Sequence, residues 1–130
     1  MIHELKLPTR LEIIEIQNSL IEEFGGATGL RDATAIDSAL ARAEHLVSYE
    51  KSPDIFKIAA AVCGGINQNH AFVDGNKRIA FVAAYIILRI NDFYLDASEH
   101  EAFEVMMKFT TKEITESDFS DWLNQKSFET

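Results

Sequence analysis

The chain has 130 residues and a formal net charge of −9; 47% of its residues are hydrophobic and 25% are charged. These proportions fit one globular domain over 1–130 and argue against a disordered chain. An acidic chain repels phosphate backbones, which disfavours direct nucleic-acid binding. One cysteine, Cys63, cannot form an internal disulfide, and with four histidines it cannot build a Cys-rich zinc site.

Two further features bear on the compartment. The N-terminus lacks the basic and then apolar pattern of a signal peptide. The longest apolar run, Ile79 to Leu88, is shorter than the roughly 20 residues that span a membrane. We therefore expect a cytoplasmic protein with no membrane partner.

Hydrophobic patterns of period 3.6 dominate the sequence and predict an all-α bundle. The first helix is expected over 8–24, where it opens with the spacing of a capping box. Its predicted apolar stripe comprises Leu11, Ile14, Leu20, Ile21 and Phe24. A second helix is expected over 33–46. A third is expected over 53–70, with Ser52 as its N-cap and a proline in its first turn.

The fourth expected helix, over 76–90, contains a ten-residue run that is apolar on every side. We therefore predict that it forms the buried centre of the bundle. A short extended or turn segment at 92–97 leads to a fifth helix over 98–111, and a last helix is expected over 117–126. The side chains that this last helix should bury are Phe119, Trp122 and Leu123.

Residues 25–32 form a loop with three glycines in five positions. Such a segment is flexible and can approach another chain closely. Composition alone favours a plain connection between helices. On the third helix, Cys63 is most simply a small buried apolar residue.

The segment between the third and fourth helices has the densest chemistry in the chain. It reads His70, Ala71, Phe72, Val73, Asp74, Gly75, Asn76, Lys77 and Arg78. The first N–H groups of a helix lack partners and carry the positive end of its dipole, so two basic residues beside them suit a phosphate. A carboxylate next to a polyphosphate is a natural Mg²⁺ ligand, and a histidine can take a proton from an attacking hydroxyl. The pattern predicts transfer of a phosphorus group from a nucleotide to a hydroxyl.

A purely structural interpretation stays open at this point. On that interpretation His70 and Asp74 cap helix ends, and the basic pair is a solvated first turn. Basic residues in a first turn oppose the helix dipole, so helix propensity does not explain them. A transition-metal site is disfavoured because two ligands are too few. The other histidines are expected on the surface: His3, His45 and His100.

The segment 70–78 resembles the signature of the Fic/Doc superfamily, specifically its death-on-curing (Doc) branch. The likeness extends to 22–32, 38–42 and the C-terminal Trp122–Leu123, and so covers nearly the whole chain. The resemblance implies the all-α Fic core. It also implies a toxin that uses ATP and Mg²⁺ to transfer the γ-phosphate to a threonine of elongation factor Tu, which stops translation.

Roles for single residues follow from their position in the family motif. The resemblance implies that His70 is the general base, that Asp74 binds Mg²⁺ and that Phe72 anchors the loop in the core. The residues implied in binding nucleotide phosphates are Gly75, Asn76, Lys77 and Arg78. A flap that docks the target segment by backbone pairing would include Gly26, Gly29, Leu30 and Arg31.

Two positions bear on which group is transferred. Lys77 stands where adenylylating Fic enzymes usually carry glycine and where Doc-type kinases carry lysine, so it favours phosphotransfer. Gly75 matches Fic forms, whereas the best-known Doc form has alanine there. AMP transfer to a protein is therefore the alternative chemistry, and an inactive Fic-like binding module is a third possibility.

The sequence also bears on regulation. Many Fic proteins restrain themselves with a Ser/Thr-x-x-x-Glu-Gly/Asn pattern, and no glutamate here is followed by glycine or asparagine. An antitoxin in trans, inserting a helical or disordered C-terminal segment into a groove near the active site, is therefore the expected partner.

Overall fold

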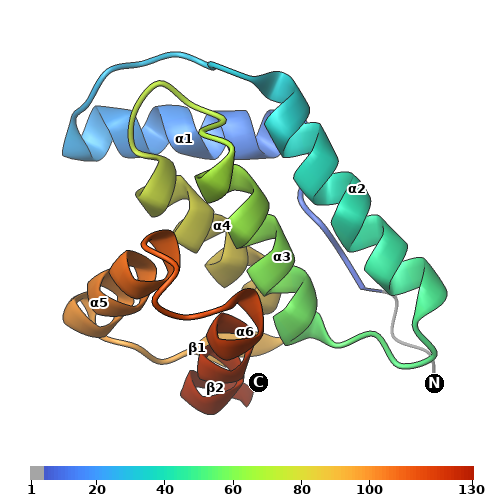
Figure 1. The fold of residues 1–130 in the computed structure, drawn as a ribbon. Helices are drawn as coiled ribbons and strands as arrows, with labels where there is room; N and C mark the ends of the chain where they lie inside the picture. Colours follow the sequence, from blue (N-terminus) through green and yellow to red (C-terminus); the bar gives the residue numbers. More distant parts are fainter. Residues whose placement is uncertain (1–4) are drawn as a thin grey trace.

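The computed structural model describes residues 5–130, and within this range the all-α prediction is confirmed (Figure 1). The elements are α1 (Arg10–Phe24), α2 (Ala33–Tyr49), α3 (Ile55–Gln68), α4 (Asn76–Ile90), β1 (Phe93–Leu95), α5 (Glu99–Thr110), α6 (Glu116–Lys126) and β2 (Ser127–Glu129). The two short strands pair antiparallel. In the described part of the chain, every helix is too short or too polar to cross a membrane.

Side-chain caps set most of the helix starts. Among residues 5–130, five helices begin after a residue whose side-chain oxygen accepts a backbone N–H. These N-caps are Thr9, Asp32, Asp54, Ser98 and Thr115. α4 differs, because its N-cap is Gly75 in the left-handed region with φ 74° and no side-chain hydrogen bond. The first N–H groups of α4 are thus left without a side-chain partner.

Several boundaries differ from the prediction; α1, for example, begins at Arg10 and not at residue 8, because Thr9 is its N-cap. α3 spans Ile55–Gln68 and not 53–70, and its N-cap is Asp54 and not Ser52, because the Asp54 carboxylate accepts a hydrogen bond from the Phe56 N–H at 2.9 Å. α2 continues past residue 46 to Tyr49, since no glycine or proline interrupts it there. The sequence does not predict β2, because its register with β1 is fixed only when distant parts of the chain meet.

The buried centre of the bundle is α3 and not α4. Ten of the 14 residues of α3 are buried, and the helix packs against α2, α4, α5 and α6. α4 buries only one face. Its other face is half-buried, because Phe81 and Val82 line a cleft and Tyr85 meets Tyr94 of the small sheet edge to face. The apolar run in α4 therefore predicted a more complete burial of this helix than the fold provides.

Two predicted core stripes are also partly wrong. α1 buries Ile13, Gln17 and Ile21, whereas the expected stripe members Leu11 and Phe24 are 65% and 59% exposed. α1 contacts the bundle along a narrow strip only. In α6, Phe119 and Leu123 are buried as predicted, and Trp122 is half-buried. Cys63 is fully buried, as expected.

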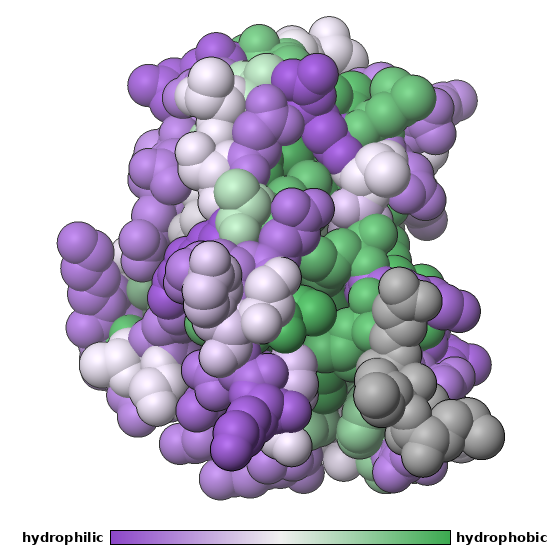
Figure 2. All heavy atoms as spheres, turned by 90° about the vertical axis from the view of Figure 1, so that its right-hand side faces the viewer, coloured by the Kyte–Doolittle hydropathy of each residue, from purple (hydrophilic) through white to green (hydrophobic). Residues whose placement is uncertain are grey.

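Long-range contacts fix the two loops that matter for function. The loop between α1 and α2 crosses over the loop between α3 and α4 (Figure 1), and Leu30 forms an antiparallel bridge with Phe72. On the far side of α2, Arg42 donates two hydrogen bonds, of 2.7 and 2.6 Å, to Glu116 of α6. Figure 2 views the molecule from the α2 side and shows a strip of hydrophobic side chains flanked by hydrophilic ones.

Candidate active site

A cleft of about 830 Å³ is bounded by α1, α4 and α5. One end is polar and consists of the α3–α4 loop and the first turn of α4. The rest is apolar and is lined by Leu20, Phe24, Val73, Phe81, Val82, Ala102, Phe103, Met106 and Met107. A cleft of this size and mixed lining is typical of a site that holds a small organic molecule or a peptide segment.

The α3–α4 loop is closed by its own side chains. Asn76 Oδ1 accepts a hydrogen bond from the Phe72 N–H at 2.9 Å, and Asn76 Nδ2 donates to the Phe72 carbonyl at 2.8 Å. Phe72 itself is 2% exposed, which confirms its predicted place in the core. Both polar atoms of the Asn76 side chain thus hold the loop closed, which leaves the backbone N–H and the second N–H of Nδ2 as donors for an anion.

Asp74 is held from three directions. Its Oδ1 accepts from the Gly75 N–H at 2.8 Å, and its Oδ2 accepts from the Ala27 N–H at 3.2 Å. The backbone carbonyl of Asp74 accepts a 2.7 Å hydrogen bond from Gln17 Nε2. The acid is thus fixed by its own loop, by the α1–α2 loop and by α1.

Gln17 is a residue that the sequence analysis missed. It is 3% exposed, and its Oε1 is buried with no hydrogen-bond partner among the described residues. A signal was present, because Gln17 lies four residues from each of the buried Ile13 and Ile21, so it is a polar residue on an apolar face. A buried polar side chain needs a hydrogen-bond partner, and here that partner is the backbone carbonyl of Asp74 in the α3–α4 loop.

The ligand atoms available near Asp74 indicate which kind of metal complex this site could hold. Over residues 5–130, no group of three or more His, Cys, Asp or Glu side chains could hold a metal ion. Mg²⁺ needs no such cage, since it binds one or two carboxylates together with phosphate oxygens and water. Asp74 at the end of the cleft therefore fits a magnesium–nucleotide complex better than an isolated ion.

Two cations stand at the start of α4. Lys77 and Arg78 are exposed, and neither forms an ion pair with a carboxylate of the described chain. The Arg78 guanidinium lies 5.0 Å from the centre of the Phe24 ring. These cations balance the two carboxylates in the lining, Asp74 and Glu99, so the cleft is formally neutral within a chain of charge −9. Free N–H groups beside two cations are suited to binding an anion.

The loop over residues 25–32, here called the flap, lies directly on the motif. The Val73 N–H donates to the Gly29 carbonyl at 3.1 Å. Gly26 has φ +119°, which favours glycine, and a Cβ there would lie 2.9 Å from Asp74 Oδ2 and would displace this carboxylate. The Arg31 side chain reaches the C-terminal end of α3. The structure thus brings the predicted flap residues and the motif together.

The remaining histidines lie outside the cleft. His45 is exposed and stacks on Tyr49, with ring centres 4.2 Å apart. His100 is exposed and lies 3.0 Å from Glu104. Both match the expectation of surface histidines, and His3 lies outside the described residues.

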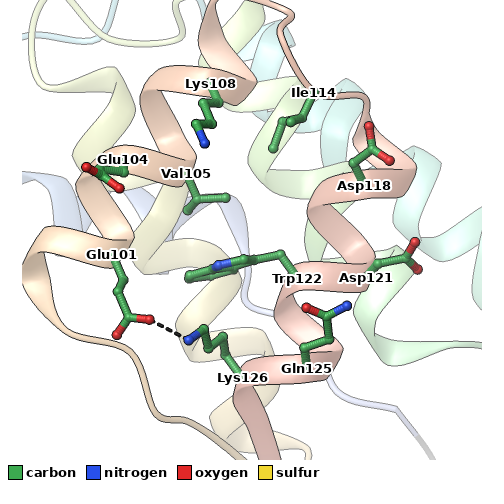
Figure 3. Close-up of a pocket in the computed structure, with 10 residues that line it drawn as sticks. All are labelled: Glu101, Glu104, Val105, Lys108, Ile114, Asp118, Asp121, Trp122, Gln125 and Lys126. Carbon is green, nitrogen blue, oxygen red and sulfur yellow. Dashed lines mark hydrogen bonds and ion pairs between the residues drawn. The ribbon is translucent and has the colours of Figure 1, made fainter.

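A second cavity, of about 480 Å³, lies between α5 and α6 (Figure 3). Trp122 extends across it, and at its edge Glu101 pairs with Lys126. The hydrogen bond from Lys126 lowers the pKa of Glu101 to about 2. No residue of the motif lines this cavity, so it is separate from the site described above.

The sequence is similar to known proteins. A sequence model described as the Fic/DOC family matches residues 8–88. The chain is 29% identical over 114 residues to "Protein kinase doc" of Escherichia phage P1, which covers 88% of this chain and 90% of that protein. It is 39% identical over 89 residues to "Toxin Doc" of Mycolicibacterium smegmatis, which covers 63% of this chain and 68% of that protein.

The all-α fold, the His–Asp–Gly–Asn–Lys–Arg motif across a helix start and a family match over more than half of the chain lead to one conclusion. The chain belongs to the Fic/Doc family. Within that family it is of the Doc type, because both of these relatives are Doc proteins and one of them matches it along nearly its full length.

Proposed function

We propose that this protein is a Doc-type toxin that transfers the γ-phosphate of ATP to a Ser or Thr hydroxyl of a translation factor, with elongation factor Tu as the first candidate target. The observation that carries the proposal is the uncapped start of α4, where free N–H groups, Lys77 and Arg78 lie in one cleft with His70 and Asp74. The phage relative named as a protein kinase supports phosphotransfer.

In the proposed reaction, the target hydroxyl oxygen forms a bond to the γ-phosphorus while the bond to the bridging oxygen breaks and ADP leaves. His70 takes the hydroxyl proton on its imidazole. The first N–H groups of α4, Lys77 and Arg78 bind phosphate oxygens and stabilise their charge. Asp74 would hold Mg²⁺, which neutralises phosphate charge when bound.

The direct test is intact-mass spectrometry of elongation factor Tu after incubation with the protein, ATP and Mg²⁺. A gain of one phosphate is expected. A gain of one AMP would instead establish adenylyl transfer, and no gain beside an active control enzyme would exclude this target.

A matched pair of variants tests the general base. His70→Ala should lower the transfer rate by about 10²–10⁴-fold, the usual contribution of a general base. His45→Ala removes another exposed histidine, outside the cleft, and should leave the rate unchanged. Circular dichroism should show both variants folded, because both side chains are exposed. Full activity of a folded His70→Ala variant would refute the assignment.

We also propose that the apolar part of the cleft receives an antitoxin segment. Its rim exposes Phe24, Phe103 and Met107 at 59%, 66% and 37%, and clustered exposed apolar side chains are typical of a docking surface. A helical segment with an apolar face fits such a groove.

A second pair of variants tests this docking surface. Phe103→Ser should weaken the binding of a purified candidate antitoxin tail by about 2 kcal/mol or more, as for a central aromatic contact. Leu11→Ser removes a side chain of nearly equal exposure, 65%, outside the cleft, and should leave affinity unchanged. Isothermal titration calorimetry measures both. Equal affinities of the two variants would place the antitoxin elsewhere.

A further inference from the structure

The backbone of His70 has an unusual conformation. Its φ is +48°, in the left-handed region that residues other than glycine seldom adopt. His70 follows Asn69, the C-cap of α3. The His70 N–H points to the Asn67 carbonyl at 3.4 Å, and the Ala71 N–H points to the Ile66 carbonyl at 3.4 Å. This is the hydrogen-bond pattern of a Schellman motif, with histidine at the position where glycine is usual.

A left-handed residue with a side chain needs support from its surroundings. The two turn hydrogen bonds at 3.4 Å are long. The end of α3 also presents backbone carbonyls that have no intrahelical partner. The conformation that aims the His70 side chain therefore depends on contacts from another element.

Arg31 makes these contacts. Its Nη1 donates to the Asn69 carbonyl at 3.2 Å and to the His70 carbonyl at 3.1 Å. Its backbone N–H donates to the Ala71 carbonyl at 2.9 Å. Arg31 thus binds three consecutive carbonyls around the left-handed residue, and its positive charge lies at the negative end of the α3 dipole.

We propose that Arg31 is a positioning residue for His70, holding the histidine backbone in the conformation that aims the imidazole into the cleft. The inference rests on the proposed function of His70 as a general base. It also assigns Arg31 a task other than the docking of the target, because the guanidinium is engaged with the protein's own backbone.

The two tasks have different kinetic signatures. A docking residue contributes to binding of the target protein, so its loss raises KM. A positioning residue orients the base in the transition state, so its loss lowers kcat and leaves KM unchanged.

The variants are Arg31→Met, which keeps the length of the side chain but removes its donors, and Arg31→Lys, which keeps a cation with donors. Arg31→Met should lower kcat for phosphotransfer by about 10- to 100-fold at constant KM, the cost of a displaced reacting group. Arg31→Lys should recover part of this loss. Arg10→Met is the matched control and should behave as wild type, since Arg10 is exposed and pairs with Asp37 away from the cleft. A raised KM with unchanged kcat in Arg31→Met would overturn the proposal.

A second measurement does not depend on activity. Amide hydrogen exchange, read by NMR on the protein alone, should be about fivefold faster or more at His70 and Ala71 in Arg31→Met, because opening of this turn becomes easier. The amides of α6 should exchange as in the wild type. Unchanged exchange at residues 70 and 71 would refute the positioning role even if the wild type modified no target. Faster exchange with an inactive wild type would refute only the proposed function.

Discussion

Gly65 of α3 packs against Ala39 of α2, and its replacement by alanine tests how tightly these helices pack. A Cβ on Gly65 would lie 2.7 Å from the Ala39 Cβ and 3.3 Å from the Ala39 Cα. Atoms of this kind normally meet at about 3.5–4.0 Å. The overlap is with backbone and with a short side chain, so it can be relieved only if α2 moves away.

The neighbouring Gly64 supplies an internal reference for the magnitude. Its Cβ would meet the Phe109 ring at 3.2 Å and a Glu116 oxygen at 3.3 Å, distances that need a shift of only a few tenths of an ångström. Both glycines lie inside α3, so the gain in helix propensity, about 1 kcal/mol, is the same for both and cancels. Overpacking costs about 1–3 kcal/mol. Gly65→Ala should therefore be less stable than Gly64→Ala by about 1–3 kcal/mol.

Urea unfolding followed by circular dichroism measures the difference in the free energy of unfolding. A functional consequence follows as well, because a displaced α2 carries the end of the flap away from the α3–α4 loop. We expect Gly65→Ala to lose transfer activity as well as stability. If Gly65→Ala proved as stable as Gly64→Ala, the packing argument would be refuted.

Three further predictions concern the site and the core. Lys77→Gly should weaken phosphotransfer and favour AMP transfer, because it opens space for phosphates. Mass spectrometry of the target distinguishes an added phosphate from an added AMP. Unchanged phosphotransfer would show that Lys77 does not determine which group is transferred. Gly26→Ala should reduce ATP binding, measured by calorimetry, more than Gly25→Ala does, because both positions have positive φ but only Gly26 meets Asp74 Oδ2, at 2.9 Å. Burial raises the pKa of the Cys63 thiol above its usual value of 9.0, so the unfolded chain ionises first as pH rises and stability should fall above about pH 9. A thiol reagent should react with Cys63 only on unfolding, and rapid labelling of native protein would contradict this.

Local chemistry in the sequence determined the all-α class, the capping boxes at Thr9 and Ser98 and the residues of the motif. These features depend on hydrogen bonds between residues three or four apart, so a linear pattern contains them. The start of α4 belongs to the same group, since Gly75, Asn76 and the two basic residues after them already indicate a positively charged helix start.

The tertiary structure determined which residues from distant parts of the chain became neighbours. It made α3 the buried centre, because the second face of α4 lines a cleft that only the neighbouring helices create. It brought Gln17 to the carbonyl of Asp74 and turned Arg31 from an expected docking residue toward the backbone of His70. These contacts join residues 39 to 57 positions apart. No periodicity within one helix encodes them, because they exist only after the helices have packed.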